Sequence, residues 1–130
     1  MATGNFVLEK GFNAAAAITK FYAVKMSGNA EEVTPVTANT DDIVGFAQFG
    51  VTAAEILKGK GSSVRMIGIT EAVATGAIDE GQWVQLEADG RVSALVNASG
   101  KTIVGKCVGH ASTNANDRIS LWIHPMRAKA

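Results

Sequence analysis

The sequence is short of residue types that mark many specialised proteins. Its 130 residues include one Cys, two Pro, two Trp, one Tyr and five Phe. A single cysteine excludes an internal disulfide, and nothing in the chain indicates an oxidising compartment. No run approaches the ~20 apolar residues of a membrane span, and the N-terminus lacks the basic and apolar pattern of a signal peptide. We therefore expect a protein that folds in a cytosol and has no membrane partner.

An excess of charge is also missing. Twelve basic and twelve acidic residues give a formal net charge of zero. A nucleic-acid-binding protein concentrates Lys and Arg to neutralise phosphates. The densest basic stretch here is Lys58, Lys60 and Arg65, which Gly and Ser interrupt. We expect no nucleic-acid partner, and we expect recognition by shape and apolar contact instead.

The residues that are abundant are small or β-branched. The chain has 21 Ala, 13 Val, 9 Ile, 10 Thr and 14 Gly, against only 5 Leu. This mixture suits pleated strands and tight turns better than helices. The length suits one domain with one core. The composition predicts an all-β fold.

The C-terminal part of the sequence shows the most legible strands. Residues 83–87 and 91–95 alternate apolar and polar side chains, and the Asp89-Gly90 turn between them predicts a β-hairpin with positive φ at Gly90. Two more strands are predicted at 103–108 and 118–123. The segment thus contains four short strands.

The N-terminal part repeats this plan. Strands are predicted at 21–26, 32–36, 43–48 and 63–69. Ile43-Val44-Gly45 recurs as Ile103-Val104-Gly105, and Val24 corresponds to Val84, both at a spacing of 60 residues. We therefore predict two pseudo-repeats, 21–69 and 82–123, related by a pseudo-two-fold axis. Together they would form a small β-barrel or β-tulip of about eight short strands.

Two segments do not follow the strand pattern. Asn13 followed by four alanines resembles a helix start, but the match of Val24 to Val84 favours a strand from about residue 20. Residues 52–58 read as a helical turn that Thr52 caps and Gly59 ends. We assign residues 20–124 to the barrel domain and 125–130 to a C-terminal tail.

Residues 1–19 have no counterpart in the repeat, and we expect them to form an N-terminal arm outside the barrel. The arm carries four apolar side chains, Phe6, Val7, Leu8 and Phe12. An apolar arm can bind a partner surface, for example by adding a strand to a sheet edge. These four residues are the predicted binding residues, and the barrel should fold without them.

The sequence offers no convincing catalytic, cofactor-binding or metal-binding set. Cys107 and His110 would point to opposite faces of a strand, so they are interpreted separately, as a buried cysteine and a structural histidine. Gly100-Lys101-Thr102 lacks the earlier glycine of a phosphate-binding loop. The acidic pairs Asp41-Asp42 and Asp79-Glu80 are interpreted as turn carboxylates. Trp83 and Trp122 are interpreted as core or rim residues.

Several segments together resemble a known family. They are residues 77–86, 89–92 and 103–109, with 23–26 and 43–47 in the first repeat. Their pattern of glycine turns and short apolar strands is similar to that of the cement (head-decoration) proteins of tailed-phage capsids. The resemblance spans roughly residues 18–123.

This resemblance implies a structural virion protein rather than an enzyme. Such a protein would be made in the host bacterial cytoplasm and would bind the major capsid protein on the outer capsid surface. It would stabilise the shell against internal pressure, often as a homotrimer at local three-fold positions. Other hypotheses remain open: a tail-tube or connector subunit, a small enzyme or enzyme subunit, or a non-viral β-barrel binding module.

Overall fold

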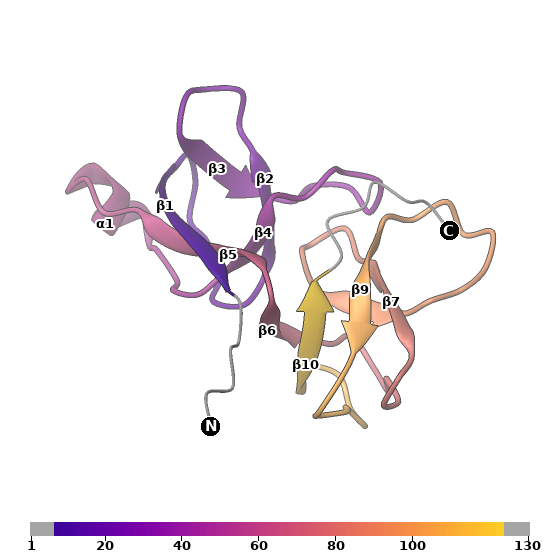
Figure 1. Ribbon diagram of the computed structural model, residues 1–130. Coiled ribbons are helices and arrows are strands. Elements are labelled where there is room, and N and C mark those ends of the chain that lie inside the picture. Colours follow the sequence, from indigo (N-terminus) through magenta and orange to yellow (C-terminus); the bar gives the residue numbers. More distant parts are fainter. Residues whose placement is uncertain (1–6, 124–130) are drawn as a thin grey trace.

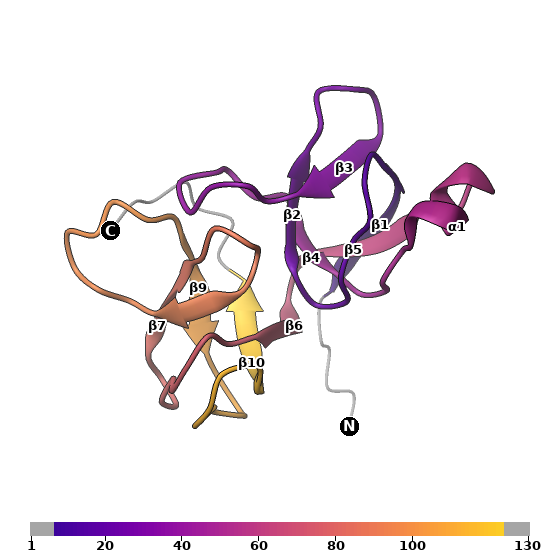
Figure 2. The same cartoon turned by 180° about the vertical axis from the view of Figure 1, so that it is seen from behind.

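The computed structural model describes residues 7–123. The chain forms two β halves that lie side by side (Figures 1 and 2). In chain order the elements are β1 (Leu8–Ala14), β2 (Ala23–Met26), β3 (Glu32–Pro35), β4 (Gly45–Ala47), α1 (Ala53–Leu57), β5 (Ser62–Ile67), β6 (Ile69–Val73), β7 (Trp83–Leu86), β8 (Val92–Ala94), β9 (Ile103–Cys107) and β10 (Arg118–Ile123). The all-β expectation is confirmed, with ten strands where about eight were expected.

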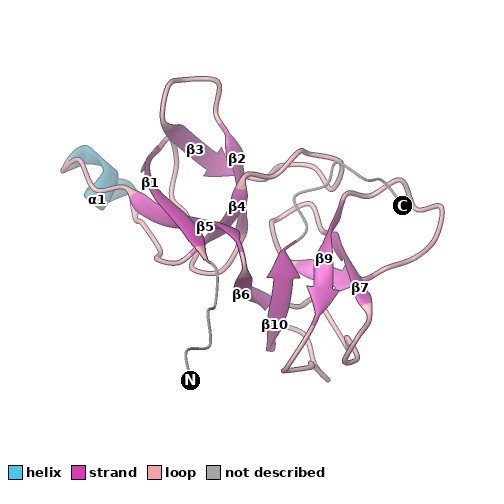
Figure 3. Ribbon diagram, viewed as in Figure 1, coloured by secondary structure: helices cyan, strands magenta, loops and turns pink. Residues whose placement is uncertain are grey.

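The first half is a closed five-stranded barrel with the strand order β1-β3-β2-β4-β5. The second half is a five-stranded sheet with the order β6-β10-β9-β7-β8. Figure 3 shows how predominantly β the molecule is, with α1 protruding from the barrel end remote from the second sheet. The β-hairpin predicted around Gly90 is confirmed, and this glycine has a φ of 96°.

Strands β6 to β10 of the second half correspond, in order, to β1 to β5 of the first half. Both halves have the same neighbour relations, and even the parallel closure recurs. Ala14 of β1 pairs in parallel with Val33, and Ala74, just after β6, forms a parallel bridge to Val92. The repeat is therefore confirmed as a shared topology, with register conserved strand by strand.

The contacts between the halves are not reciprocal, so the expected pseudo-two-fold axis is wrong. The Ala23 amide of the first half donates to the Gly90 carbonyl of the second at 2.9 Å. A two-fold axis would bury Ala23 and its counterpart Trp83 alike. Ala23 is fully buried, whereas Trp83 is 41% exposed.

The prediction of an arm over residues 1–19 is wrong from Leu8 onward. β1 pairs with β5 along five positions and with β3 along two, and so closes the barrel. Removing residues 1–12 would therefore remove most of a barrel strand. The first repeat begins with β1 and ends with β5 at Ile67, and Gly68, with a φ of 111°, separates it from β6. The expected tail at 125–130 lies outside the described residues.

The two ambiguous segments are now settled. Residues 13 and 14 end β1, and Ile18 forms a two-hydrogen-bond bridge with Val51, so no helix begins at Asn13. The helical turn is confirmed as α1. Its capping box joins the Thr52 hydroxyl to the Glu55 amide and the Glu55 carboxylate to the Thr52 amide. The Lys60 ammonium, with the hydrogen bonds of this box, lowers the pKa of Glu55 to about 2.

The core is built from two clusters, one of which spans both halves. The barrel cluster contains only first-half residues, such as Val24, Val33 and Val64. The larger cluster fills the second half but includes Ala23, Val36 and Phe46 of the first. Because Phe46 is fully buried among second-half side chains, the larger cluster joins the two halves.

Candidate binding surface

A row of three exposed apolar side chains and one lysine crosses the outer face of the second sheet. Trp122 of β10 lies opposite Ile69 of β6 on one side and Lys106 of β9 on the other, and Lys106 lies opposite Trp83 of β7. Ile69, Trp122 and Trp83 are 48%, 47% and 41% exposed. We call these four residues the outer row. Contiguous exposed apolar side chains of this kind mark interaction sites.

Strand alternation explains why the outer row faces outward. In β10 the residues Ile119, Leu121 and Ile123 are buried, which leaves Trp122 on the opposite face. The Lys106 ammonium lies 5.6 Å from the centroid of the Trp83 ring, a cation–π contact. Of the interpretation of the two tryptophans as core or rim residues, the core alternative is wrong, since both lie on the outer face.

A second apolar surface lies where the described chain begins. Leu8 of β1 lies opposite Ile67 of β5, and both are exposed, as is Val7. We call these three residues the N-terminal patch. Of the predicted binding residues, Val7 and Leu8 therefore lie on the surface.

The remaining two predicted binding residues do not belong to this patch. Phe12 is buried and packs in the barrel core, because it lies on the inward face of β1. Phe12 is only 8% exposed and therefore contributes to the fold rather than to the exposed patch. Phe6 lies outside the described residues.

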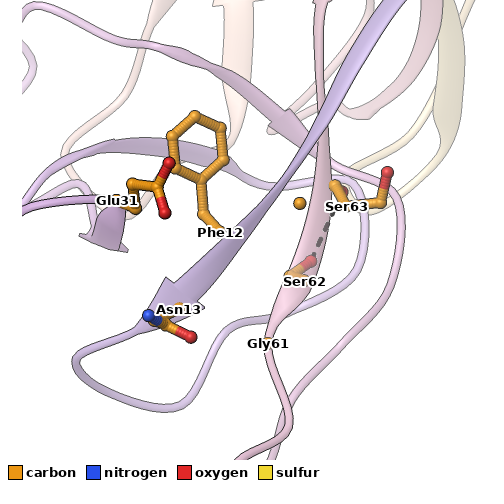
Figure 4. Close-up of a pocket in the computed structure, with 7 residues that line it drawn as sticks. Phe12, Asn13, Glu31, Gly61, Ser62 and Ser63 are labelled. Atoms are coloured by element: carbon orange, nitrogen blue, oxygen red, sulfur yellow. Dashed lines mark hydrogen bonds between the residues drawn. The ribbon is translucent and has the colours of Figure 1, made fainter.

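A hollow of about 390 Å³ opens on the barrel between β1, β5 and the β2–β3 turn (Figure 4). It is lined by Gly11, Phe12, Asn13, Glu31, Gly61, Ser62 and Ser63. Glu31 lies at its edge and forms an ion pair with Lys10 at 3.0 Å. The Ser62 hydroxyl donates to the Phe49 carbonyl at 2.9 Å, so this hydroxyl is already hydrogen-bonded within the fold. The hollow offers a shaped surface rather than a set of reactive groups.

The turn carboxylate Asp41 has a structural role between the halves. It accepts hydrogen bonds from the Lys25 ammonium and the amides of Thr37 and Ala38, each at 3.0 Å. Its own carbonyl accepts from the Thr102 hydroxyl of the second half at 2.9 Å. Burial would raise the pKa of Asp41, but these hydrogen bonds and the Lys25 charge outweigh burial and lower it.

Cys107 and His110 form no nucleophile–base pair. The Cys107 thiol is buried and donates to the His110 backbone carbonyl at 3.2 Å. Burial, with the charges of Glu80 and Asp79, raises the pKa of the thiol and disfavours the thiolate. The interpretation of Cys107 as a buried structural residue is confirmed.

Between residues 7 and 123, no three His, Cys, Asp or Glu side chains gather as metal ligands would. Over the same residues, no helix has the length and apolar character needed to cross a membrane.

Comparison with known proteins identifies the family. The model of the phage cement proteins matches residues 39–122 of this chain, from the β3–β4 loop to β10. The chain belongs to the phage cement protein family. This family is one of structural proteins of the phage capsid, which places the chain among the components of the virion.

A solved structure has the same fold. The N base of the head fiber protein gp8.5 of bacteriophage phi29 matches with a TM-score of 0.67 and 17% sequence identity. The match covers 96% of this chain and 98% of that one, so both halves of the fold are shared. No curated protein sequence matches the chain.

Sequence reasoning missed the outer row. Its members come from four strands and are scattered over residues 69–122, so only the register of the second sheet brings them together. The available signal was the alternation around Trp122. Leu121 and Ile123 are also apolar and lie on the opposite face of the strand, so one of the two faces had to remain outside the core.

Proposed function

We propose that this phage cement protein binds the outer surface of a tailed-phage capsid and stabilises the shell against internal pressure. The match to the cement family over residues 39–122 carries this proposal. The partner is the major capsid protein, and the role is structural rather than enzymatic. The protein is made in the cytoplasm of the host bacterium before it joins the shell.

We propose that the N-terminal patch, with Phe6 beside it in the sequence, contacts the shell. Val7 and Leu8 keep their side chains in solvent in the single chain. Burying such a side chain fully contributes ~1.5–3 kcal/mol, whereas ordering each residue of a flexible segment costs ~1–2 kcal/mol. Leu8 is already fixed in β1, so less ordering free energy is lost when it binds than in a free arm.

Homotrimers at local three-fold positions are the proposed arrangement on the shell. Association of free copies is weak, and the shell supplies the effective concentration that completes it. A cyclic trimer has a heterologous interface that closes on itself. The packing of the two halves of one chain supports this arrangement, because it is itself a non-reciprocal contact between similar units.

Co-sedimentation with shells assembled without the protein tests the proposal. The wild-type chain should pellet with shells to a saturating stoichiometry, and Leu8→Ser should bind at least ~10-fold more weakly, an effect of ~1.4 kcal/mol. Leu57→Ser is the matched control, since Leu57 of α1 is 90% exposed and outside the patch. Failure of the wild-type chain to bind shells would refute the function. An equal loss of shell binding in both variants would refute the role of the N-terminal patch in binding.

A further inference from the structure

Trp83 and Lys106 of the outer row have positional counterparts in the first half that lie against the second half. The counterparts of Ile69 and Trp122 are Glu9 and Arg65, which form a partly exposed ion pair. Ala23 of β2 lies opposite Phe46 of β4, as Trp83 of β7 lies opposite Lys106 of β9. Each member of one pair lies 60 residues from its counterpart. The two pairs therefore occupy the same place on the outer face of their half.

In the first half this place is covered. Ala23 and Phe46 are fully buried, because the second half of the same chain packs on them. Val36, which follows β3, is covered in the same way. Its counterpart Leu95 is only half-buried. The part of the outer face of the first half around Ala23 and Phe46 is thus an interface, and its occupant is a unit of this fold.

We propose that the outer row is the interface for a second copy of this chain. Trp83, Trp122 and Ile69 are apolar although they lie on a sheet face open to solvent in the single chain. The fold already buries the equivalent face of its first half against a β unit of its own kind. A second copy supplies another such unit.

The surface that receives the outer row is identified by the same correspondence. In the second half, Gly90 accepts a hydrogen bond from Ala23, and the Arg118 guanidinium lies 4.9 Å from the centroid of the Phe21 ring. The register of the strands makes Glu31 the counterpart of Gly90 and Gly61 the counterpart of Arg118. Glu31 and Gly90 also share a left-handed backbone, with φ of 52° and 96°.

Glu31 and Gly61 both line the hollow on the barrel (Figure 4). The hollow of the first half therefore occupies the place that corresponds to the surface on which the second half receives residues 21–23. An indole is far larger than the methyl group of Ala23, and the hollow supplies the room for it. The carboxylate of Glu31 at its edge also complements the ammonium of Lys106.

The contact inferred here is head to tail. The second half of one copy meets the first half of the next, so the two contacting surfaces differ. This inference does not require the shell-binding role of the N-terminal patch. It concerns contacts between copies, and the patch concerns contacts with the shell.

Cysteine cross-linking between two variants tests the contact. Both carry Cys107→Ala, which reproduces Ala47 at the corresponding place of the first half. One variant adds Trp83→Cys and the other Glu31→Cys, and they are mixed and oxidised both at high concentration and on shells. The mixed pair should form a disulfide-linked dimer roughly 10-fold or more faster than either variant alone, since docking raises the effective concentration of the two thiols.

Leu57→Cys in the same background, mixed with Trp83→Cys, gives the rate of random collision. A mixed pair no faster than this control, in solution and on shells, would overturn the inference. Equally fast linking of Trp83→Cys to itself would indicate a two-fold contact and would also overturn it. Linking of Trp83→Cys to capsid protein instead would assign the outer row to the shell. Thermal melting of each variant beside its parent verifies that all are folded.

Discussion

Gly45 and Gly105 lie 60 residues apart and occupy the same place in the two halves, against the backbone of a neighbouring strand. A Cβ at Gly45 would lie 2.2 Å from the carbonyl oxygen of Arg65, and one at Gly105 would lie 2.1 Å from that of Trp122. Real Cβ atoms do not approach backbone so closely. The repeated Ile-Val-Gly motif therefore records a close approach of strands that both halves require.

Gly45→Ala and Gly105→Ala should each destabilise the protein by at least ~1–3 kcal/mol, because backbone must move to admit the methyl group. Gly11→Ala is the matched control within a strand, since nothing lies within 4 Å of a Cβ there. Denaturant unfolding monitored by circular dichroism measures the difference. If both variants were as stable as the wild-type protein, the neighbouring strands could move apart without loss of stability, which would contradict this prediction.

Phe46→Ala should lower the free energy of unfolding by ~3–5 kcal/mol, the usual range for a buried phenylalanine. Because Phe46 packs in the core of the second half, both halves should still unfold in a single transition. Phe49→Ala removes an exposed ring from the same region and should change stability little. Two separate transitions in the wild-type protein would contradict the joining of the two halves by the larger cluster.

Asp41→Asn should destabilise the protein by ~1–3 kcal/mol at pH 7, since it weakens hydrogen bonds made to a charged group. Folding lowers the pKa of Asp41, so its charge contributes stability that is present above the ordinary value of 3.8. That contribution is lost as the pH falls through the lowered folded-state pKa. The difference between variant and wild type should therefore shrink below about pH 4. Glu71→Gln, at an exposed position of β6, is the control, and a difference independent of pH would refute the role of the Asp41 charge.

Phe12→Ala should destabilise the barrel by ~3–5 kcal/mol, because the ring is buried in the barrel core. Leu8→Ser, on the exposed part of the same strand, should lower the melting temperature only slightly. Differential scanning calorimetry of the two variants measures both effects. Equal melting temperatures for Phe12→Ala and wild type would indicate that this segment is dispensable for the fold, as a free arm would be.

The repeat could be predicted from the sequence where both copies keep the same residues. Ile-Val-Gly and the valines at 24 and 84 gave the correct spacing for β2, β4, β7 and β9. β1 was missed because Leu8–Ala14 shares with the counterpart segment 68–74 little beyond the final alanine. β6 was missed because the apolar pattern continues through Gly68, and only its positive φ marks the break.

The candidate surfaces were less predictable for a different reason. Phe12 has the same apolar character as Leu8, and only the pairing of β1 decides that one faces the core and the other solvent. Trp83 likewise begins a strand whose next residue, Val84, faces inward. Which face of a strand is buried depends on contacts between distant segments, and the sequence states those only indirectly.

The release of DNA from heated particles tests the cementing role most directly. Particles of the phage assembled without this protein are heated alone, with the purified wild-type chain, or with Leu8→Ser. We expect the wild-type chain to raise the temperature of DNA release until its binding sites on the shell are filled, and we expect Leu8→Ser to require a higher concentration for the same effect. An unchanged release temperature at saturating wild-type protein would contradict the account.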